Sequence, residues 1–117
     1  MTHRDLEVWK MSMALVETVY KLMNAMPDEE KYGLISQIKR SSISIPSNIA
    51  EGAARGSTKE FIRFLDIATG SLSELETQFL LCTRLRFLNF DDIPLDEITS
   101  ISKMIYKLKL SLKIKRN

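Results

Sequence analysis

The side chains best suited to chemistry in this chain are cations that could hold an anion. Six basic residues and no acidic one fall within residues 101–117, whereas four acids fall within residues 91–97. Cations near the end of a helix and anions near its start are also what the helix dipole favours. The pattern therefore predicts either an anion-binding surface or a helix whose basic end is only solvated.

Phosphate is the anion that such a basic surface would suit best, so a nucleic acid is the expected partner. The net charge of +2 does not indicate that partner by itself. We find no aromatic side chains interleaved among the cations, so base stacking is not indicated. The candidate nucleic-acid-binding residues are Lys39, Arg40, Arg55, Lys59, Arg63, Lys103, Lys107, Lys109, Lys113, Lys115 and Arg116.

Catalytic and metal-binding residues are scarce. His3 is the only histidine and lies near a terminus, which leaves no histidine for acid-base, triad or metal chemistry inside the fold. Glu74 and Glu76 differ by two positions and point to different faces of a helix. We expect no enzymatic activity, no cofactor and no metal. A metal or small-molecule site around Glu51 and Glu74 is kept as an alternative.

Cys82 is the only cysteine, so one chain cannot form an internal disulfide. It lies on an apolar helical stripe, which favours a small core residue over a nucleophile. The opening residues do not look like a secretory signal, and no apolar run approaches the roughly 20 residues that cross a bilayer. We expect a cytoplasmic protein with no membrane partner.

Four amphipathic segments must position these side chains. Their apolar residues recur every three or four positions, which is the spacing of one helical face. A chain of 117 residues suits a single domain, residues 1–117, with one continuous core. The sequence predicts an all-α fold, an antiparallel up-down-up-down four-helix bundle, with helices at roughly 5–25, 29–54, 58–88 and 92–112.

The apolar rows predict which side of each helix enters the core. In the first helix the row is Leu6, Trp9, Met13, Val16, Tyr20 and Met23. The row of the second helix is Ile35, Ile38, Ile45 and Ile49, and that of the fourth is Ile98, Ile101, Ile105, Leu108 and Leu112. In the third helix a core row from Phe61 to Cys82 has a second apolar flank, made by Phe64, Ile67, Leu81, Leu85 and Leu88. One bundle core does not need so wide an apolar surface, which suggests contact with another subunit.

The second helix combines an apolar row with a regular polar row. The polar row is Gln37, Ser41, Ser44, Asn48, Glu51 and Arg55. It is either a small-residue contact face with hydrogen-bonding capacity or a solvated side. Pro46 removes a backbone donor and either kinks or breaks this helix. We favour the kink, because both rows keep their phase across the proline.

A turn near Gly56 should join the second and third helices. Ser57 and Glu60 after it have the spacing of a capping box. Antiparallel pairing about this turn places Ser44 beside Gly70, where a close backbone approach would explain a glycine inside a helix. The same register predicts two polar contacts, Glu51 with Arg63 and Arg40 with Ser73 or Glu74.

Residues 37–40, 44–52, 59–61 and 70–78 resemble the bacterial four-helix bundle proteins, also called 23S ribosomal RNA intervening-sequence proteins. The similarity covers nearly the whole chain. The motif residues that we interpret as structural are Gln37, Ser44, Pro46, Asn48, Glu51, Gly52, Gly70, Ser71, Glu74 and Gln78. Arg86 and Phe87 depart from the glycine and tyrosine usual in the family, so the third helix could continue past the usual break.

The resemblance implies a four-helix bundle that assembles as a homopentamer and has no known enzymatic activity. It also implies kinship with the accessory variability determinant of diversity-generating retroelements, a basic pentamer thought to bind reverse transcriptase and nucleic acid. We therefore expect a non-enzymatic homo-oligomer that binds RNA or another nucleic acid through a basic surface. The alternative is a protein-binding scaffold or accessory subunit that docks a partner such as a reverse transcriptase.

Overall fold

The computed structural model describes residues 2–116, apart from the side chains of Lys115 and Arg116. Four long helices are present: α1 (Glu7–Met23), α2 (Leu34–Ala54), α3 (Thr58–Arg84) and α4 (Leu95–Arg116). Three short 3-10 helices accompany them: η1 (His3–Asp5), η2 (Asp28–Glu30) and η3 (Phe90–Asp92). The described residues contain no strand, so the predicted all-α, antiparallel four-helix bundle is confirmed.

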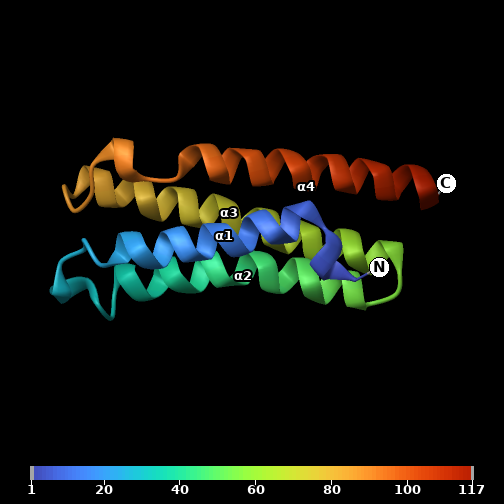
Figure 1. The fold of residues 1–117 in the computed structure, drawn as a ribbon, viewed down its shortest axis with the longest axis horizontal. Coiled ribbons are helices and arrows are strands. Elements are labelled where there is room, and N and C mark those ends of the chain that lie inside the picture. The colour runs from blue at the N-terminus through green and yellow to red at the C-terminus, as the bar shows by residue number, and fades with distance from the viewer. Residues whose placement is uncertain (1, 117) are drawn as a thin grey trace.

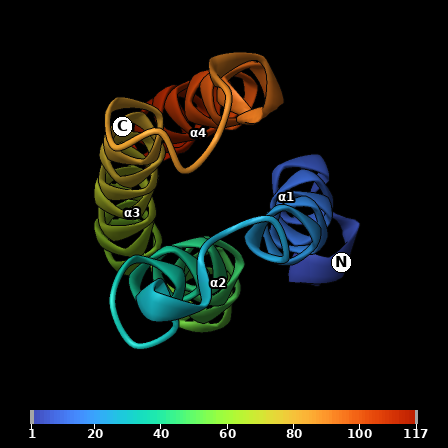
Figure 2. The same cartoon turned by 90° about the vertical axis from the view of Figure 1, so that its left-hand side faces the viewer.

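The four helices run side by side and surround one core in chain order (Figures 1 and 2). The α2–α3 turn lies at one end of the bundle, and the other two connections lie at the opposite end (Figure 1). The molecule is an elongated rod of 49 × 21 × 19 Å. Among residues 2–116, no helix combines the length and apolarity that crossing a bilayer requires.

The predicted apolar rows of α2, α3 and α4 do enter the core. Their fully buried members are Ile38, Ile45, Ile49, Leu65, Ala68, Leu72, Leu75, Phe79, Cys82, Ile98, Ile101 and Ile105. Leu108 and Leu112 are partly buried and pack against the same cluster. Apolar side chains at helical spacing thus identified the inner faces of three helices, because burying them supplies most of the driving force for folding.

α1 turns a different face to the core from the one predicted. Its buried residues are Val8, Ser12, Leu15, Val19 and Met23, so only Met23 of the predicted row is buried. Met13 and Tyr20 are 43% and 40% exposed. Ser12 occupies one place in the true core row, and its hydroxyl donates to the Val8 carbonyl oxygen at 2.7 Å. This local hydrogen bond satisfies the hydroxyl, so a polar residue can lie in the core. A search for apolar residues alone therefore did not identify the row that contains Ser12.

Two helix starts lie later in the chain than predicted. α2 begins at Leu34 instead of residue 29, because η2 is a separate turn and Gly33 leaves the helical region at φ −106° and ψ −111°. α4 begins at Leu95 instead of residue 92, after η3. At its far end α4 continues to Arg116, beyond the predicted end at residue 112.

α3 ends at Arg84, four residues before the predicted end at residue 88. Arg86 takes a left-handed conformation with φ 63°, which L side chains rarely adopt. The Phe87 amide then donates to the Cys82 carbonyl oxygen at 2.9 Å and closes the end of the helix. The break usual in the family is therefore present, with arginine where glycine is usual.

α2 continues through Pro46 as one helix, so the alternative of two separate segments is wrong. Pro46 is itself buried, as are Ile45 and Ile49 in the same helix. Packing on these neighbours holds the helix together across the missing backbone donor.

The middle of the polar row of α2, at Ser41 and Ser44, is a contact face toward α3, whereas Gln37, Glu51 and Arg55 are exposed, so each of the two interpretations holds for part of the row. The Ser44 and Ser71 hydroxyls lie 2.8 Å apart, and the Ser41 hydroxyl donates to the Glu74 carboxylate. Asn48 donates to the Ser44 carbonyl oxygen at 2.8 Å and orients that part of the row. These hydrogen bonds set the register of the two helices, since a slip of one residue would leave partly buried polar groups unpaired.

Gly70 does not have the predicted close backbone approach. It is exposed, and a Cβ atom placed on it would meet nothing within 4 Å. The register is shifted by about one residue from the predicted one, so that Ser44 bonds Ser71. The close approach between the helices lies at Gly52 instead, beside the α2–α3 turn.

Candidate nucleic-acid interface

The structure separates the predicted cations into distinct environments. Arg55, Lys59 and Arg63 lie around the α2–α3 turn, Lys39 and Arg40 lie along α2, and Lys103, Lys107, Lys109 and Lys113 lie on α4. The side chains of Lys115 and Arg116 lie outside the described residues. The predicted residues therefore do not form one continuous surface on a single helix, and each group has to be judged by what its charges contact.

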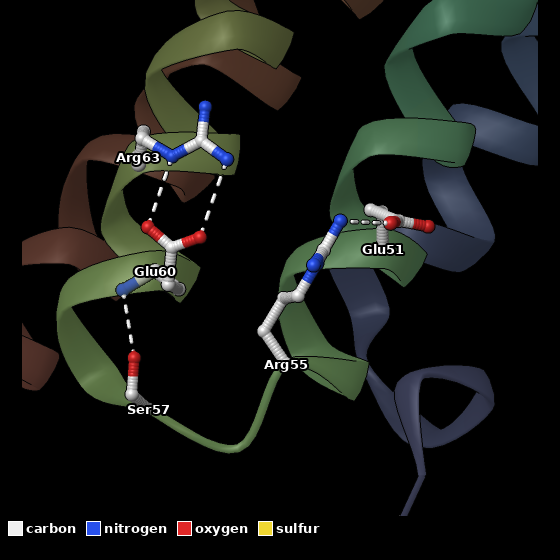
Figure 3. A network of polar contacts seen from close by, with 5 residues as sticks. All are labelled: Glu51, Arg55, Ser57, Glu60 and Arg63. Carbon is white, nitrogen blue, oxygen red and sulfur yellow. Dashed lines mark hydrogen bonds and ion pairs between the residues drawn. The ribbon is translucent and has the colours of Figure 1, made fainter.

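Glu51, Arg55, Glu60 and Arg63 form a set of ion pairs that we call the turn cluster (Figure 3). Arg55 Nη2 donates to Glu51 Oε1 at 2.7 Å. Arg63 donates through Nε at 3.0 Å and Nη2 at 3.2 Å to the two carboxylate oxygens of Glu60. Each arginine is thus neutralised by a carboxylate of its own helix, one turn away.

Two predicted side-chain contacts are wrong. Glu51 pairs with Arg55 and not with Arg63, because a partner one turn away is already close before the helices pack and costs less ordering than one across the interface. Glu74 bonds Ser41 across the α2–α3 interface and not Arg40, because the register is shifted from the predicted one.

The start of α3 shows how Glu60 is used. The Ser57 hydroxyl accepts the Glu60 amide at 3.1 Å, which is the first half of the predicted capping box. The Glu60 carboxylate bonds Arg63 instead of completing the box. The hydrogen bond with Arg63 lowers the pKa of the Glu60 carboxyl, and the same bond raises the pKa of the Arg63 guanidinium. Both groups therefore stay charged and paired near neutral pH.

The Phe64 ring holds both guanidinium groups of the turn cluster. The ring centroid lies 4.5 Å from Cζ of Arg63 and 5.1 Å from Cζ of Arg55. Gly52 allows this ring to approach α2, because a Cβ atom on Gly52 would lie only 2.7 Å from the Phe64 Cβ. Each of the two arginines thus contacts both a carboxylate and the face of the Phe64 ring. Because Arg55 follows α2 and Phe64 belongs to α3, these contacts link the two helices.

Two more predicted cations are also engaged. The Lys39 ammonium lies 4.7 Å from the centroid of the Tyr20 ring. The Lys109 ammonium donates to Asp66 of α3. Arg40 and Lys59 are exposed, and they belong to α2 and α3, not to the helix that carries the lysines of α4.

The outward side of α4 carries three exposed lysines that make no ion pair with any described residue. Three apolar side chains share this side: Tyr106 and Leu110 lie between the lysines and Ile114 follows the last one, and they are 62%, 42% and 75% exposed. Helical spacing places all six opposite the core row of α4. We call this set the basic face of α4; its members are Lys103, Tyr106, Lys107, Leu110, Lys113 and Ile114.

Tyr106 is the residue of this face that the sequence analysis missed. The expectation of no aromatic side chain among the cations is wrong, because Tyr106 lies between Lys103 and Lys107 and is exposed. A shallow hollow of about 460 Å³ is lined by Ser102, Lys103, Tyr106, Lys107 and Leu110. The sequence could have shown this, because Tyr106 comes three positions after Lys103 and directly before Lys107.

A second hollow, of about 400 Å³, differs sharply in its charge. Its lining is His3, Trp9, Met13, Val16, Ile43, Pro46, Ser47 and Ala50, with no lysine or arginine. Trp9, predicted to anchor the core, is only partly buried and meets the His3 ring edge-on, with centroids 5.2 Å apart. This hollow lies on the apolar row that the sequence analysis assigned to the core of α1, and it offers no cation to a phosphate.

The thiol and the carboxylates considered for catalysis or metal binding make packing contacts or hydrogen bonds within the protein. Burial raises the pKa of the Cys82 thiol to about 11, so the thiol is protonated at neutral pH and packs as a core side chain. Glu51 and Glu74, the alternative metal site, bond Arg55 and Ser41 respectively. Within residues 2–116, no group of three or more His, Cys, Asp or Glu side chains could hold a metal ion.

The fold and its surface define a class, that of small antiparallel four-helix bundles with a basic, partly apolar outer face. The family model of the 23S rRNA-intervening sequence protein matches residues 4–107. The chain belongs to this family, as the resemblance of its motifs predicted. The matched region includes Lys103, Tyr106 and Lys107 of the basic face and ends before Lys113. A comparison with curated proteins finds no match.

Proposed function

We propose that this protein is a non-enzymatic helical bundle that binds RNA, or another nucleic acid, through phosphates held on the basic face of α4. The observation that carries the proposal is the set of three exposed lysines, Lys103, Lys107 and Lys113, without an ion-pair partner among the described residues. The family name refers to ribosomal RNA, which supports RNA as the anion.

The physical basis is the release of counterions. Lysines that neutralise phosphates release the cations condensed on the nucleic acid, and the gain in entropy favours binding. Ten residues of α-helix separate Lys103 from Lys113, a span of about 15 Å. Flexible ammonium groups along this span position a phosphate backbone without reading its sequence. Several copies in one assembly would multiply the contacts and raise the apparent affinity.

The test is the affinity for a labelled RNA measured against salt concentration. We expect binding at low salt that weakens steeply as salt rises. The variant Lys103→Ala/Lys107→Ala/Lys113→Ala should bind about 10- to 100-fold more weakly, with a salt slope smaller by about two units. A control with the same loss of charge is Lys10→Ala/Lys21→Ala/Lys31→Ala on other parts of the surface. Equal loss in both variants, or no RNA binding at low salt, would contradict the proposal.

We also propose that the protein is a homo-oligomer, of which a pentamer is the form that the family resemblance implies. The predicted second flank of α3 supports this in part: Ile67, Leu81 and Leu85 are exposed, as is Leu80 beside them. Phe64 and Leu88 of that flank are buried in the protomer. Leu80, Leu81 and Leu85 together form an exposed apolar patch at the end of α3, which suits contact with a second copy.

Light scattering of the variant Leu81→Asp/Leu85→Asp tests that assembly. We expect the wild type to have the mass of an oligomer and the variant to have the mass of a single chain. The rival function, a scaffold that docks a protein such as a reverse transcriptase, predicts that a partner stays bound when Lys103, Lys107 and Lys113 are changed to Ala. A wild-type protomer that remains single at high concentration would exclude the assembly.

A further inference from the structure

We propose that the basic face of α4 binds single-stranded nucleic acid, with one base stacked on the Tyr106 ring and adjacent phosphates held by Lys103 and Lys107. This inference rests on the proposed function and adds the class of nucleic acid to it. It assigns to Tyr106 a contact with a base, which a surface of lysines alone would not make.

The first support is the state of the Tyr106 ring. The side chain is 62% exposed and forms part of the wall of the hollow on α4. Among the described residues, no aromatic or cationic group lies over this ring. The other two tyrosines differ, because Lys39 lies over Tyr20 and Lys31 lies 5.7 Å from the centroid of Tyr32. Tyr106 is the tyrosine whose ring is left for an outside planar group.

The second support is the placement of charge around that ring. Lys103 lies one turn before Tyr106 and Lys107 lies next to it, and both line the same hollow. The sequence from residue 98 to residue 114 contains no acidic side chain. The nearest lysine with a carboxylate partner is Lys109, which turns toward Asp66 on α3. The phosphates on either side of a stacked nucleoside would therefore meet cations that no carboxylate competes for.

The shape of the surface favours a single strand over a duplex. Bases inside a duplex are stacked on one another, and the deep major groove of an RNA helix is closed to side chains. A tyrosine on the outside of a straight helix could reach such a base only after the base had left its stack. The bases of a single strand are already available, and stacking on an aromatic ring tolerates any base.

Other occupants fit the same face less well. The apolar row from Tyr106 to Ile114 spans eight residues, or about 12 Å, whereas helices that lie in a membrane surface bury a long apolar side. The core side of α4 is not free for that purpose, because Ile98, Ile101 and Ile105 are buried in the bundle. A second copy would have to place carboxylates against three lysines, and the exposed apolar patch at the end of α3 suits a second copy better.

Fluorescence anisotropy with three labelled probes tests the proposal: a 12-nucleotide oligouridine RNA, an abasic oligomer with the same number of phosphates, and a blunt RNA duplex. Wild-type protein should bind the oligouridine about 5- to 100-fold more tightly than the abasic oligomer. Tyr106→Leu should lose that preference, and Tyr106→Phe should keep it. The salt slope should be the same in all three proteins, because the phosphate contacts remain.

The outcomes separate this inference from the proposed function. If the wild type binds the abasic oligomer or the duplex as tightly as oligouridine, the stacking on Tyr106 is wrong while phosphate binding stands. If no probe binds at low salt, both proposals are wrong. Phosphatidylserine-containing vesicles and light scattering complete the test. If Tyr106→Leu abolishes binding to the vesicles and the wild type shows no preference for oligouridine, the face binds a membrane and the inference is wrong. If Tyr106→Leu changes the mass in solution, the face contacts a second copy and the inference is again wrong.

Discussion

The α2–α3 turn and the outer side of α4 both present cations beside an aromatic ring, and they use them in opposite ways. At the turn, Arg55 and Arg63 each bond a carboxylate of their own helix and lie against Phe64, which is 8% exposed. On α4, Lys103 and Lys107 flank the exposed ring of Tyr106 and have no carboxylate partner among the described residues. The number of cations in a region therefore does not locate an anion site.

The difference follows from where the acids lie in the sequence. Each turn arginine has a glutamate three or four residues before it, and this spacing brings the two together on the helix surface. A phosphate would have to displace that glutamate before it could bind. Lys103, Lys107 and Lys113 have no acid within reach along their own helix and no carboxylate partner on another described helix, so their charge remains available to an outside anion.

The largest expected effect is at Gly52, where the turn cluster is packed most tightly. Gly52→Ala places a Cβ atom 2.7 Å from the Phe64 Cβ and 3.3 Å from the Phe61 carbonyl oxygen, so the helices must separate. We expect the free energy of unfolding to fall by about 1–3 kcal/mol in chemical denaturation. RNA affinity of the folded variant should not change. An unchanged unfolding midpoint would show that the turn is not the tight joint described above.

A smaller effect should follow from removing the acids of the turn cluster. Glu51→Gln/Glu60→Gln leaves Arg55 and Arg63 charged but without their carboxylates. We expect RNA affinity at low salt to rise about 3- to 10-fold, with a steeper salt slope, because two more cations become available. Glu17→Gln/Glu76→Gln makes the same change of net charge elsewhere. An equal rise in that control would mean that total charge, and not release of the arginines, sets the affinity.

The smallest effect should come from Gly70, which has the same residue type as Gly52 in the opposite environment. A Cβ atom there meets nothing within 4 Å, and alanine is the better helix former. Gly70→Ala should raise the free energy of unfolding by about 0.5–1 kcal/mol, with the mass in solution unchanged. A loss of stability together with a lower mass would place this part of α3 inside a contact between copies.

Local spacing explains which parts of the site could be predicted. The lysines of α4 were predicted from their run in the sequence, and the Ser57 cap was predicted from its position before Glu60. The neutralisation of Arg55 and Arg63 was missed, although the spacing of Glu51 and Glu60 could have shown it. Tyr106 was missed although its spacing from the core row of α4 already placed it on the outer side, next to Lys107.

The sequence by itself determined four helices and the inner faces of α2, α3 and α4. These follow from spacing within one helix, which depends on covalent geometry and on the burial of apolar area. Only the tertiary structure decided that Ser12 lies in the core, that Gly52 rather than Gly70 is the close approach, and that Ser44 bonds Ser71. Those outcomes depend on how neighbouring helices are rotated and how far apart they lie, and packing sets both only when all four helices meet.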